Sequence, residues 1–395
     1  MPGIRLSVFI NFIILLIGFF VFSCITGEKK EFTPNPQVIA KQEVETLPIG
    51  IKAPDFYLPG ANGRFYKLSD FDRSQLLLVV FISVHCPESQ LYEDVLINLV
   101  DDYRKKKLQV VCISPDSPLA LLYEDQKYSD LNDDYNSMMI RALVKGFKFP
   151  YLYDGDTHEV SLKYGPQHTP HAFLFDKDRK LRYSGRLDDI LEQGKINAGL
   201  LRDAIDVILA GGKIKTNRTR SFGCDIKWSW DHEQKKDEER RWQNRPVMLD
   251  EIDIESISIL LSNPTKKLLL VNFWASWCAP CVKELPAFVE VYRMYNFNLE
   301  VVTISVDKYK DKEKAHDILR KHHAAMSNYI YNGKTHSELI KSVKPFWNGS
   351  VPMTMLIEPG GEVANMWYGP VTPYVLRRTI IENDQMGRFR RYLDK

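Results

Sequence analysis

The feature that most limits how this chain can fold is a pair of cysteines at the end of a run of apolar residues. Cys278 and Cys281 follow the buried-strand pattern of residues 268–274, and a helical pattern continues from the pair to about residue 295. A cysteine at the start of a helix lies near unpaired backbone N–H groups and the positive end of the helix dipole, and both favour its thiolate. The pair therefore predicts a nucleophilic sulfur at the junction of a strand and a helix.

The spacing of the pair separates redox chemistry from the other uses of two cysteines. If Cys278 forms a mixed disulfide with a substrate, Cys281 lies one turn into the helix and can attack that bond. Half of a zinc site would need a second Cys or His pair at ligand spacing, and none follows in this part of the chain. A static disulfide does not require the preceding Trp277. The spacing favours a redox centre.

The same layout occurs earlier in the chain with one cysteine missing. An apolar strand pattern at residues 76–82 precedes Cys86, a helical pattern follows, and Ser89 stands where a second cysteine would be. Strands and helices alternate in both halves, which is typical of a mainly parallel sheet with helices on both faces. We therefore expect an internal duplication of the α/β class, with two domains that each have a central mixed β-sheet flanked by helices.

The N-terminal residues differ in kind from the rest. Residues 1–24 contain one basic residue, an apolar stretch from Val8 to Phe22, and then Ser23 and Cys24, which is typical of a secretion segment. The end of this segment resembles a bacterial lipoprotein signal, which implies that Cys24 becomes the lipidated N-terminus. An uncleaved membrane anchor and a soluble secreted product are the alternatives. We expect a membrane-anchored protein of the cell envelope, on the periplasmic side.

Composition divides the remaining chain into domains and connecting segments. Residues 25–50 carry Glu, Lys, Pro and Gln without an apolar period, and we interpret them as a tether. Residues 212–248 mix charges of both signs, and we interpret them as a solvated linker with a tail that contains Cys224. The two expected domains are then residues 51–211 and residues 249–395.

The balance of charged residues bears on the partners of the protein. The chain has 53 Lys and Arg residues against 51 Asp and Glu residues, a formal net charge of +2 at pH 7. Such a chain has no net field that would concentrate an anionic polymer, so we expect no nucleic-acid partner.

The cysteine count predicts at least one free thiol. An exported chain meets an oxidising or redox-managed compartment, and without Cys24 it has an odd number of cysteines. Cys112 lies between apolar residues in a strand pattern, and we expect it to be an inert core residue.

The C-terminal half carries a family resemblance over about residues 250–385. It resembles the TlpA/ResA-like thiol-disulfide oxidoreductases of the thioredoxin superfamily at Trp277, Cys278, Pro280, Cys281, Glu284 and Pro286. The resemblance implies a thioredoxin-like domain tethered on the outer side of a bacterial membrane. It also implies protein clients with thiols or disulfides, and a thiol-type electron donor in the membrane.

The same resemblance implies roles for two residues outside the cysteine pair. Val351-Pro352 matches a cis-proline loop that faces the cysteines and aligns a substrate backbone, and only X-Pro bonds adopt the cis form cheaply. Glu284 matches an acidic group that tunes the thiol pKa. The alternatives are a strand-entry proline for Pro352 and a solvated helix carboxylate for Glu284.

The N-terminal half, about residues 52–228, is similar to peroxiredoxin-like redoxins of unknown activity. The similarity lies in His-Cys-Pro around Cys86 and in Phe-Gly-Cys-x-Ile-Lys-Trp at residues 222–228. It implies a second thioredoxin-like domain, in which Pro170 occupies the place of the cis proline. True peroxiredoxins have Pro and Thr or Ser seven and three residues before the reactive cysteine. Here those positions are Val79 and Ser83, so half of the peroxidase motif is absent.

Cys86 lacks a neighbouring thiol, and two hypotheses address what it does. The tail could fold back so that Cys224 supplies the second thiol and pairs with Cys86; the alternative is two unrelated cysteines. His85, His168 and His171 could instead gather around Cys86 as ligands of copper or zinc. Solvated or core histidines are more common than ligands, so we expect no metal and no other cofactor.

We therefore expect an exported, membrane-tethered thiol-disulfide oxidoreductase with Cys278 as the attacking and Cys281 as the resolving thiol. The first domain, with Cys86 as its single thiol at the helix start, would act as a relay or accessory that the second domain reduces. Two alternatives stay open. The protein could be a thiol-dependent peroxidase with the second domain as reductant, or the first domain could be a non-catalytic module that binds clients or a metal.

Overall fold

A computed structural model describes residues 32–188, 196–295, 298–333, 335–343 and 347–386. The expected secretion segment at residues 1–24, with the lipidation candidate Cys24, lies outside the described residues. Within the described ranges, no helix has both the length and the apolar character needed to cross a membrane.

The first domain is built on a five-stranded sheet. Its strands are β3 (Leu76–Phe81), β4 (Leu108–Ser114), β5 (Tyr151–Tyr153), β7 (His171–Phe175) and β8 (Leu181–Gly185). They lie in the order β5-β4-β3-β7-β8, with β3, β4 and β5 parallel and β7 antiparallel to both β3 and β8. Its helices are α2 (Pro87–Tyr103), α3 (Tyr135–Lys145), α4 (Glu159–Tyr164) and α5 (Gly199–Leu209). A short hairpin of β1 (Tyr57–Pro59) and β2 (Phe65–Lys67) precedes them.

The second domain repeats this plan with one more strand. Its strands are β10 (Asp250–Ile252), β11 (Leu268–Trp274), β12 (Leu299–Ser305), β13 (Ser327–Tyr331), β14 (Met353–Ile357) and β15 (Val363–Tyr368). Their order is β10-β13-β12-β11-β14-β15, with the first four parallel and β14 antiparallel to both neighbours. The helices are α7 (Ile254–Leu261), α8 (Ala279–Tyr295), α9 (Lys312–Lys321), α10 (His336–Val343) and α11 (Pro373–Glu382). The α/β class and the two sheet-and-helix domains expected from the sequence are confirmed.

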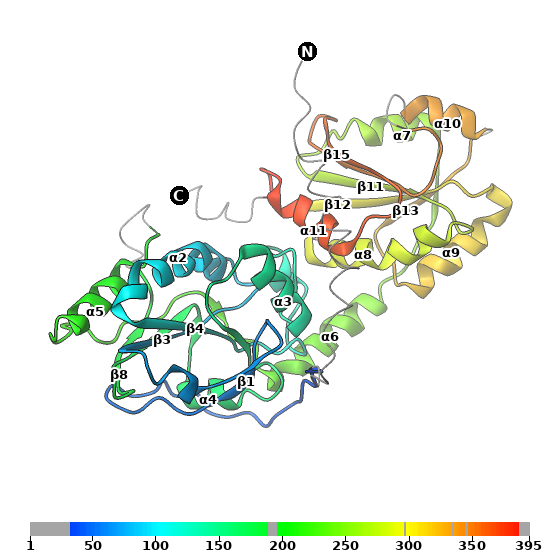
Figure 1. The fold of residues 1–395 in the computed structure, drawn as a ribbon. Coiled ribbons are helices and arrows are strands. Elements are labelled where there is room, and N and C mark those ends of the chain that lie inside the picture. Colours follow the sequence, from blue (N-terminus) through cyan, green and yellow to red (C-terminus); the bar gives the residue numbers. More distant parts are fainter. Residues whose placement is uncertain (1–31, 189–195, 296–297, 334, 344–346, 387–395) are drawn as a thin grey trace, which may run out of the picture. The chain divides into compact units, whose positions relative to one another are not determined.

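The strand before each functional cysteine lies inside its sheet and is buried along its whole length. β3 runs between β4 and β7, β11 runs between β12 and β14, and every residue of both is buried. Helices cover both faces, with α2 and α4 on opposite sides of the first sheet (Figure 1). Strands buried on both faces need continuous apolar sequence, which explains the two apolar runs. They give a rigid base for the residues that follow them.

The segment before the first domain is more ordered than a free tether. Residues 34–48 form no helix or strand, yet the N–H of Leu47 donates to the carbonyl of Tyr164 at 3.0 Å and that of Gln37 to Asp156 at 2.9 Å. The Leu47 side chain is buried in the core of the first domain. The buried Leu47 side chain and the two backbone hydrogen bonds therefore fix this part of the segment.

The segment between the domains also contains regular structure. β9 (Cys224–Asp225) pairs with β6 (His168–Thr169), and α6 (His232–Gln243) follows. The prediction of a solvated linker is correct only in part, because Trp242 and Glu238 of α6 are buried. The many charged residues of this segment gave no sign of a helix that buries an aromatic side chain, Trp242.

Candidate active sites

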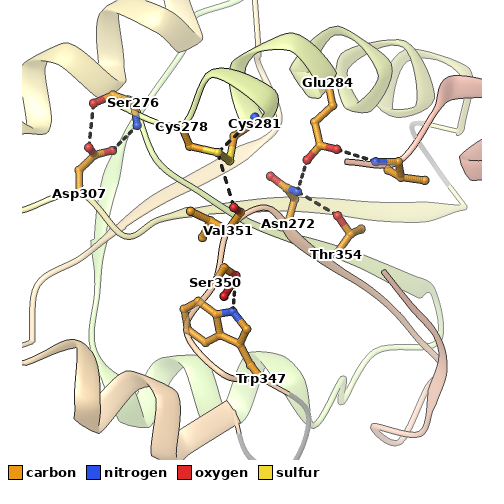
Figure 2. The surroundings of a disulfide bond; sticks show 11 residues. Asn272, Ser276, Cys278, Cys281, Glu284, Asp307, Trp347, Ser350, Val351 and Thr354 are labelled. Carbon is orange, nitrogen blue, oxygen red and sulfur yellow. Dashed lines mark hydrogen bonds between the residues drawn. A yellow bond between two sulfur atoms is a disulfide. The ribbon is translucent and has the colours of Figure 1, made fainter. Parts of the chain in front are cut away.

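Cys278 and Cys281 form a disulfide at the start of α8 (Figure 2). Their Cα atoms are 5.3 Å apart, and the backbone N–H of Cys281 donates to Cys278 Sγ at 3.3 Å. β11 ends at Trp274 and α8 begins at Ala279, so the pair lies at the strand-to-helix junction. Cys278 is 6% exposed and Cys281 1%, so an incoming thiol reaches Cys278 first.

A cis-proline loop faces Cys278. The peptide bond between Val351 and Pro352 is cis, and the Val351 carbonyl oxygen lies 3.7 Å from Cys278 Sγ. The indole N–H of Trp347 donates to the Ser350 carbonyl at 2.7 Å, which fixes the loop just before this point (Figure 2). The loop therefore sets a backbone acceptor beside the sulfur.

Glu284 lies on α8, one turn beyond Cys281, and points into the domain (Figure 2). Its Oε1 accepts a hydrogen bond from the Asn272 side chain at 3.0 Å, and its Oε2 accepts one from the Val371 N–H at 2.8 Å. Burial raises the pKa of Glu284 to about 7, although both hydrogen bonds act to lower it. A carboxyl group with this pKa can take up or release a proton under physiological conditions.

Two polar residues that the sequence analysis did not single out also hold this site. Asp307 accepts hydrogen bonds from the Ser276 N–H at 2.8 Å and the Ser276 hydroxyl at 2.7 Å, and these fix the turn before the cysteine pair. Asn272 is a polar residue within the apolar run of β11, which is a signal that could have identified it. Asp307 carries no comparable signal, because it follows a different strand.

In the first domain, Cys86 occupies the position that corresponds to Cys278. It is the N-cap of α2, and its sulfur accepts a hydrogen bond from the Ser89 N–H at 3.4 Å. The bond between Thr169 and Pro170 is cis, and the Thr169 carbonyl oxygen lies 3.0 Å from Cys86 Sγ. Ser89, which replaces the second cysteine, accepts a hydrogen bond from the Ser83 N–H at 3.2 Å.

The tail brings Cys224 to Cys86. β9 pairs with β6 so that Cys224 stands opposite Thr169, next to the cis proline. Glu88 Oε2 lies 3.4 Å from Cys86 Sγ and 3.3 Å from Cys224 Sγ. The two sulfurs and this oxygen are within 4.8 Å of one another, and both cysteines are free thiols in this structure. Glu88 was not singled out from the sequence.

The motif at residues 222–228 has a structural role in this arrangement. A Cβ on Gly223 would lie 1.9 Å from the Thr169 carbonyl oxygen, so only glycine allows the tail to approach the loop. Further along, the Lys227 N–H donates to Asp116 at 2.7 Å, and the rings of Trp228 and Trp230 stack with centroids 4.8 Å apart. These contacts hold Cys224 in place.

The pKa values of the two thiols of this site are shifted in opposite directions. Burial and the Glu88 carboxylate act to raise the pKa of Cys86, but the Cys224 thiol, His85 and Ser89 outweigh them, and the pKa is lowered. The pKa of Cys224 is raised by its hydrogen bond with Cys86, by burial, and by the Glu88 carboxylate. Of the two, Cys86 is therefore the more acidic thiol.

Among the described residues, the group of three metal-ligand atoms that includes Cys86 contains neither His168 nor His171. His168 Nδ1 is 3.0 Å from the Ser221 hydroxyl, and His171 Nε2 is 3.0 Å from the Ser184 hydroxyl. Burial lowers the pKa of His171 to about 3, so this ring is neutral.

His85 belongs to a buried charged group beneath Cys86. Its Nδ1 bonds to Asp133, and Asp116 lies 3.8 Å away. Burial acts to lower the pKa of His85, but Asp133 and Asp116 outweigh it and raise the pKa to about 10. A positive charge on His85 acts to lower the pKa of the Cys86 thiol. Among the described residues, two groups could supply three metal-ligand atoms: Cys86, Glu88 and Cys224, and His85, Asp116 and Asp133.

Two families match this chain: residues 49–184 match the AhpC/TSA family, and residues 266–363 match a thioredoxin-like family. Sporulation thiol-disulfide oxidoreductase A of Bacillus subtilis is 27% identical over 125 residues, which are 31% of this chain and 72% of the relative. Thiol-disulfide oxidoreductase ResA of Oceanobacillus iheyensis is 27% identical over 122 residues, and this chain spans 59% of its length. A solved structure of a hypothetical protein from Sinorhizobium meliloti 1021 is 33% identical in sequence. The match covers 48% of this chain and 98% of that protein, with a TM-score of 0.42.

The raised pKa of Glu284 predicts a specific pH dependence of stability. Between its ordinary pKa of 4.5 and the folded value of about 7, the folded protein keeps a proton that the unfolded chain has released. Stability therefore falls as the pH rises through this window, by at most about 3 kcal/mol. We expect urea unfolding of the oxidised protein to show this fall relative to Glu284→Gln. The exposed Glu338→Gln is the control, and a wild-type curve parallel to that of Glu284→Gln would contradict the prediction.

Proposed function

Because this chain carries an AhpC/TSA-family domain and a thioredoxin-like domain in tandem, we propose that it is a thiol-disulfide oxidoreductase acting through Cys278 and Cys281. The observation that carries the proposal is the disulfide between these cysteines at the start of α8, with the Val351 carbonyl 3.7 Å from Cys278 Sγ. Two relatives are named as thiol-disulfide oxidoreductases, which supports it. The two electrons that are exchanged are carried by the sulfurs of Cys278 and Cys281 themselves.

The geometry supports a two-step exchange. In the reduced form, the helix start and the Cys281 N–H stabilise a thiolate on Cys278, which attacks a client disulfide and releases one client thiolate. Cys281 then loses its proton and attacks Cys278, which releases the second client thiol and restores the disulfide. The client gains two electrons and the pair loses two. Glu284, on the same helix and with a pKa of about 7, is suited to take up the proton from Cys281.

The surface at Cys278 supports a protein client. Trp277 is 69% exposed beside the pair and offers an apolar face to a docked chain. The cis-proline loop at Val351 offers backbone acceptors to an extended client segment, so binding can use main-chain groups that every protein has. Broad selectivity among clients follows from such contacts.

We assign the protein to the outer side of a bacterial membrane. Support comes from residues 1–24, whose apolar stretch ends in Ser23-Cys24, as in a lipidated secretion segment. A thiol-type donor in the same membrane would then reduce the Cys278–Cys281 disulfide after each turnover.

The first domain is proposed to act as a relay, whose disulfide between Cys86 and Cys224 is reduced by the Cys278–Cys281 pair. The observation that favours this role is the convergence of Cys86 and Cys224 within 4.8 Å. Because both domains belong to one chain, each meets the other at roughly millimolar effective concentration. The competing role is a module that binds a client or a metal through Cys86, Glu88 and Cys224 without redox chemistry.

Serine substitutions test the exchange at the second domain. With insulin as client and dithiothreitol as reductant, we expect Cys278→Ser and Cys281→Ser to reduce turnover to the background rate. Only Cys281→Ser should accumulate a mixed disulfide with insulin at Cys278, because the attacking thiol is intact and the resolving thiol is absent. Cys86→Ser is the matched control and should keep full turnover. Activity in Cys278→Ser would refute the assignment.

The relay is tested in the full chain by trapping. We expect oxidised Cys281→Ser protein, treated with one equivalent of reductant, to form a disulfide between Cys278 and a cysteine of the first domain. Peptide mapping by mass spectrometry identifies this bond, and Cys278→Ser is the control that cannot form it. If Cys86 and Cys224 both stay free thiols under every oxidising condition, the relay is refuted and the binding-module role is favoured instead.

A further inference from the structure

The two thiols of the first domain differ in their access to solvent. Cys86 is 0% exposed, enclosed between the start of α2 and the loop at Thr169. Cys224 is half-buried on β9, and its neighbour Phe222 is 52% exposed. A protein partner that docks here therefore meets Cys224 and the apolar ring beside it before it meets Cys86.

We propose that the first domain exchanges disulfides with its partners at Cys224, with Cys86 as the internal thiolate and Glu88 as the carrier of the Cys224 proton. This inference rests on the proposed relay and names the sulfur at which the relay operates. It reverses the order in the second domain, where the cysteine at the helix start is the exchanging thiol. Partners of this site are proteins that carry a thiol or a disulfide.

The Thr169 carbonyl and the Glu88 carboxylate accept hydrogen bonds from the Cys86 sulfur, while other groups around it act to lower its pKa. The sulfur accepts a hydrogen bond from the Ser89 N–H at 3.4 Å at the start of α2, where the helix dipole favours negative charge. His85, charged through its contact with Asp133, adds a buried cation nearby. A thiolate stabilised in this way is a good leaving group, and thiol-disulfide exchange is faster when the leaving thiol is more acidic.

The surroundings of Cys224 require a proton acceptor. A thiol attacks a disulfide only after it has lost its proton, so Cys224 needs a nearby base that accepts this proton. Glu88 Oε2 lies 3.3 Å from Cys224 Sγ and is itself buried, so this carboxylate can accept the proton directly. The Lys227 side chain of the same tail is paired with Asp125 at 2.8 Å.

The steps balance for oxidation of the site by a partner disulfide. Cys224 transfers its proton to Glu88 and attacks one sulfur of the partner, which forms a mixed disulfide and releases the first partner thiolate; this thiolate takes the proton from Glu88. The Cys86 thiolate then attacks the Cys224 sulfur, which forms the Cys86–Cys224 disulfide and releases the second partner thiolate to be protonated by solvent. The site loses two electrons and the partner gains two.

The reverse sequence describes reduction by the second domain. The Cys278 thiolate attacks Cys224, and Cys86 leaves as a thiolate. Cys281 then loses its proton to Glu284 and attacks Cys278, and Cys224 leaves as a thiolate that takes a proton from solvent by way of Glu88. The second domain loses two electrons and ends as the Cys278–Cys281 disulfide.

The order of the thiols is tested in a full-length chain in which Cys24, Cys278 and Cys281 are replaced by serine. Dithiobis(nitrobenzoate), a small chromogenic disulfide, is the probe. We expect Cys86→Ser to form an adduct that maps to Cys224, and Cys224→Ser to react at least about tenfold more slowly, because access limits attack. Rapid reaction of Cys224→Ser together with inert Cys86→Ser would overturn the proposal. The second domain takes no part, so this result is independent of the relay.

The role of Glu88 is tested by Glu88→Gln in the Cys86→Ser background. A carboxylate that only raises the pKa of Cys224 would slow the reaction, and its removal would then speed adduct formation. If Glu88 accepts the proton, its removal slows the reaction instead. We therefore expect Glu88→Gln to slow adduct formation by about 100-fold. Glu88→Asp should recover part of the rate. Asp94→Asn, an exposed change on the same helix, should leave it unaltered. A faster Glu88→Gln reaction would refute the proton-carrier role.

Discussion

The structure depends on one arrangement that occurs twice, a sulfur at the first turn of a helix facing the carbonyl before a cis proline. The distance is 3.7 Å from Cys278 to Val351 and 3.0 Å from Cys86 to Thr169. The helix start stabilises negative charge on the sulfur, and the carbonyl accepts a hydrogen bond from a thiol or a docked chain. The strands beside both elements are buried along their whole length inside their sheets, which fixes the sulfur and the loop relative to each other.

The two domains differ in the origin of the second thiol. In the second domain it lies three residues along the same helix, so strand, turn and helix supply the whole site. In the first domain Ser89 holds a local hydrogen bond instead, and the thiol of Cys224 comes from a tail more than a hundred residues away. That tail needs Gly223 for its close approach and a row of anchoring contacts beyond it. Cys224 on the tail is also more exposed than Cys281 in its helix, and this exposure is the reason why we place the exchange at Cys224.

Much of the fold and half of the site followed from the sequence, for reasons that particular residues illustrate. The apolar runs at residues 76–82 and 268–274 predict strands that are buried on both faces, and the cysteines that follow them predict redox sites. Glu88, Asp133 and Asp307 were not identified, because each acts through a partner distant in the sequence and an acidic residue alone resembles a solvated one. The relative exposure of Cys86 and Cys224 could not be predicted either, because it depends on how the tail folds over the loop.

The most direct measurement is a redox titration of the full chain at a series of glutathione potentials, with disulfides and free thiols mapped at each potential by mass spectrometry. We expect two bonds to titrate, Cys278–Cys281 and Cys86–Cys224, while Cys112 stays a thiol throughout because it is fully buried in β4. If Cys278–Cys281 is the only bond that forms, the first domain has no redox couple, and the second sulfur-and-carbonyl arrangement serves binding rather than electron transfer.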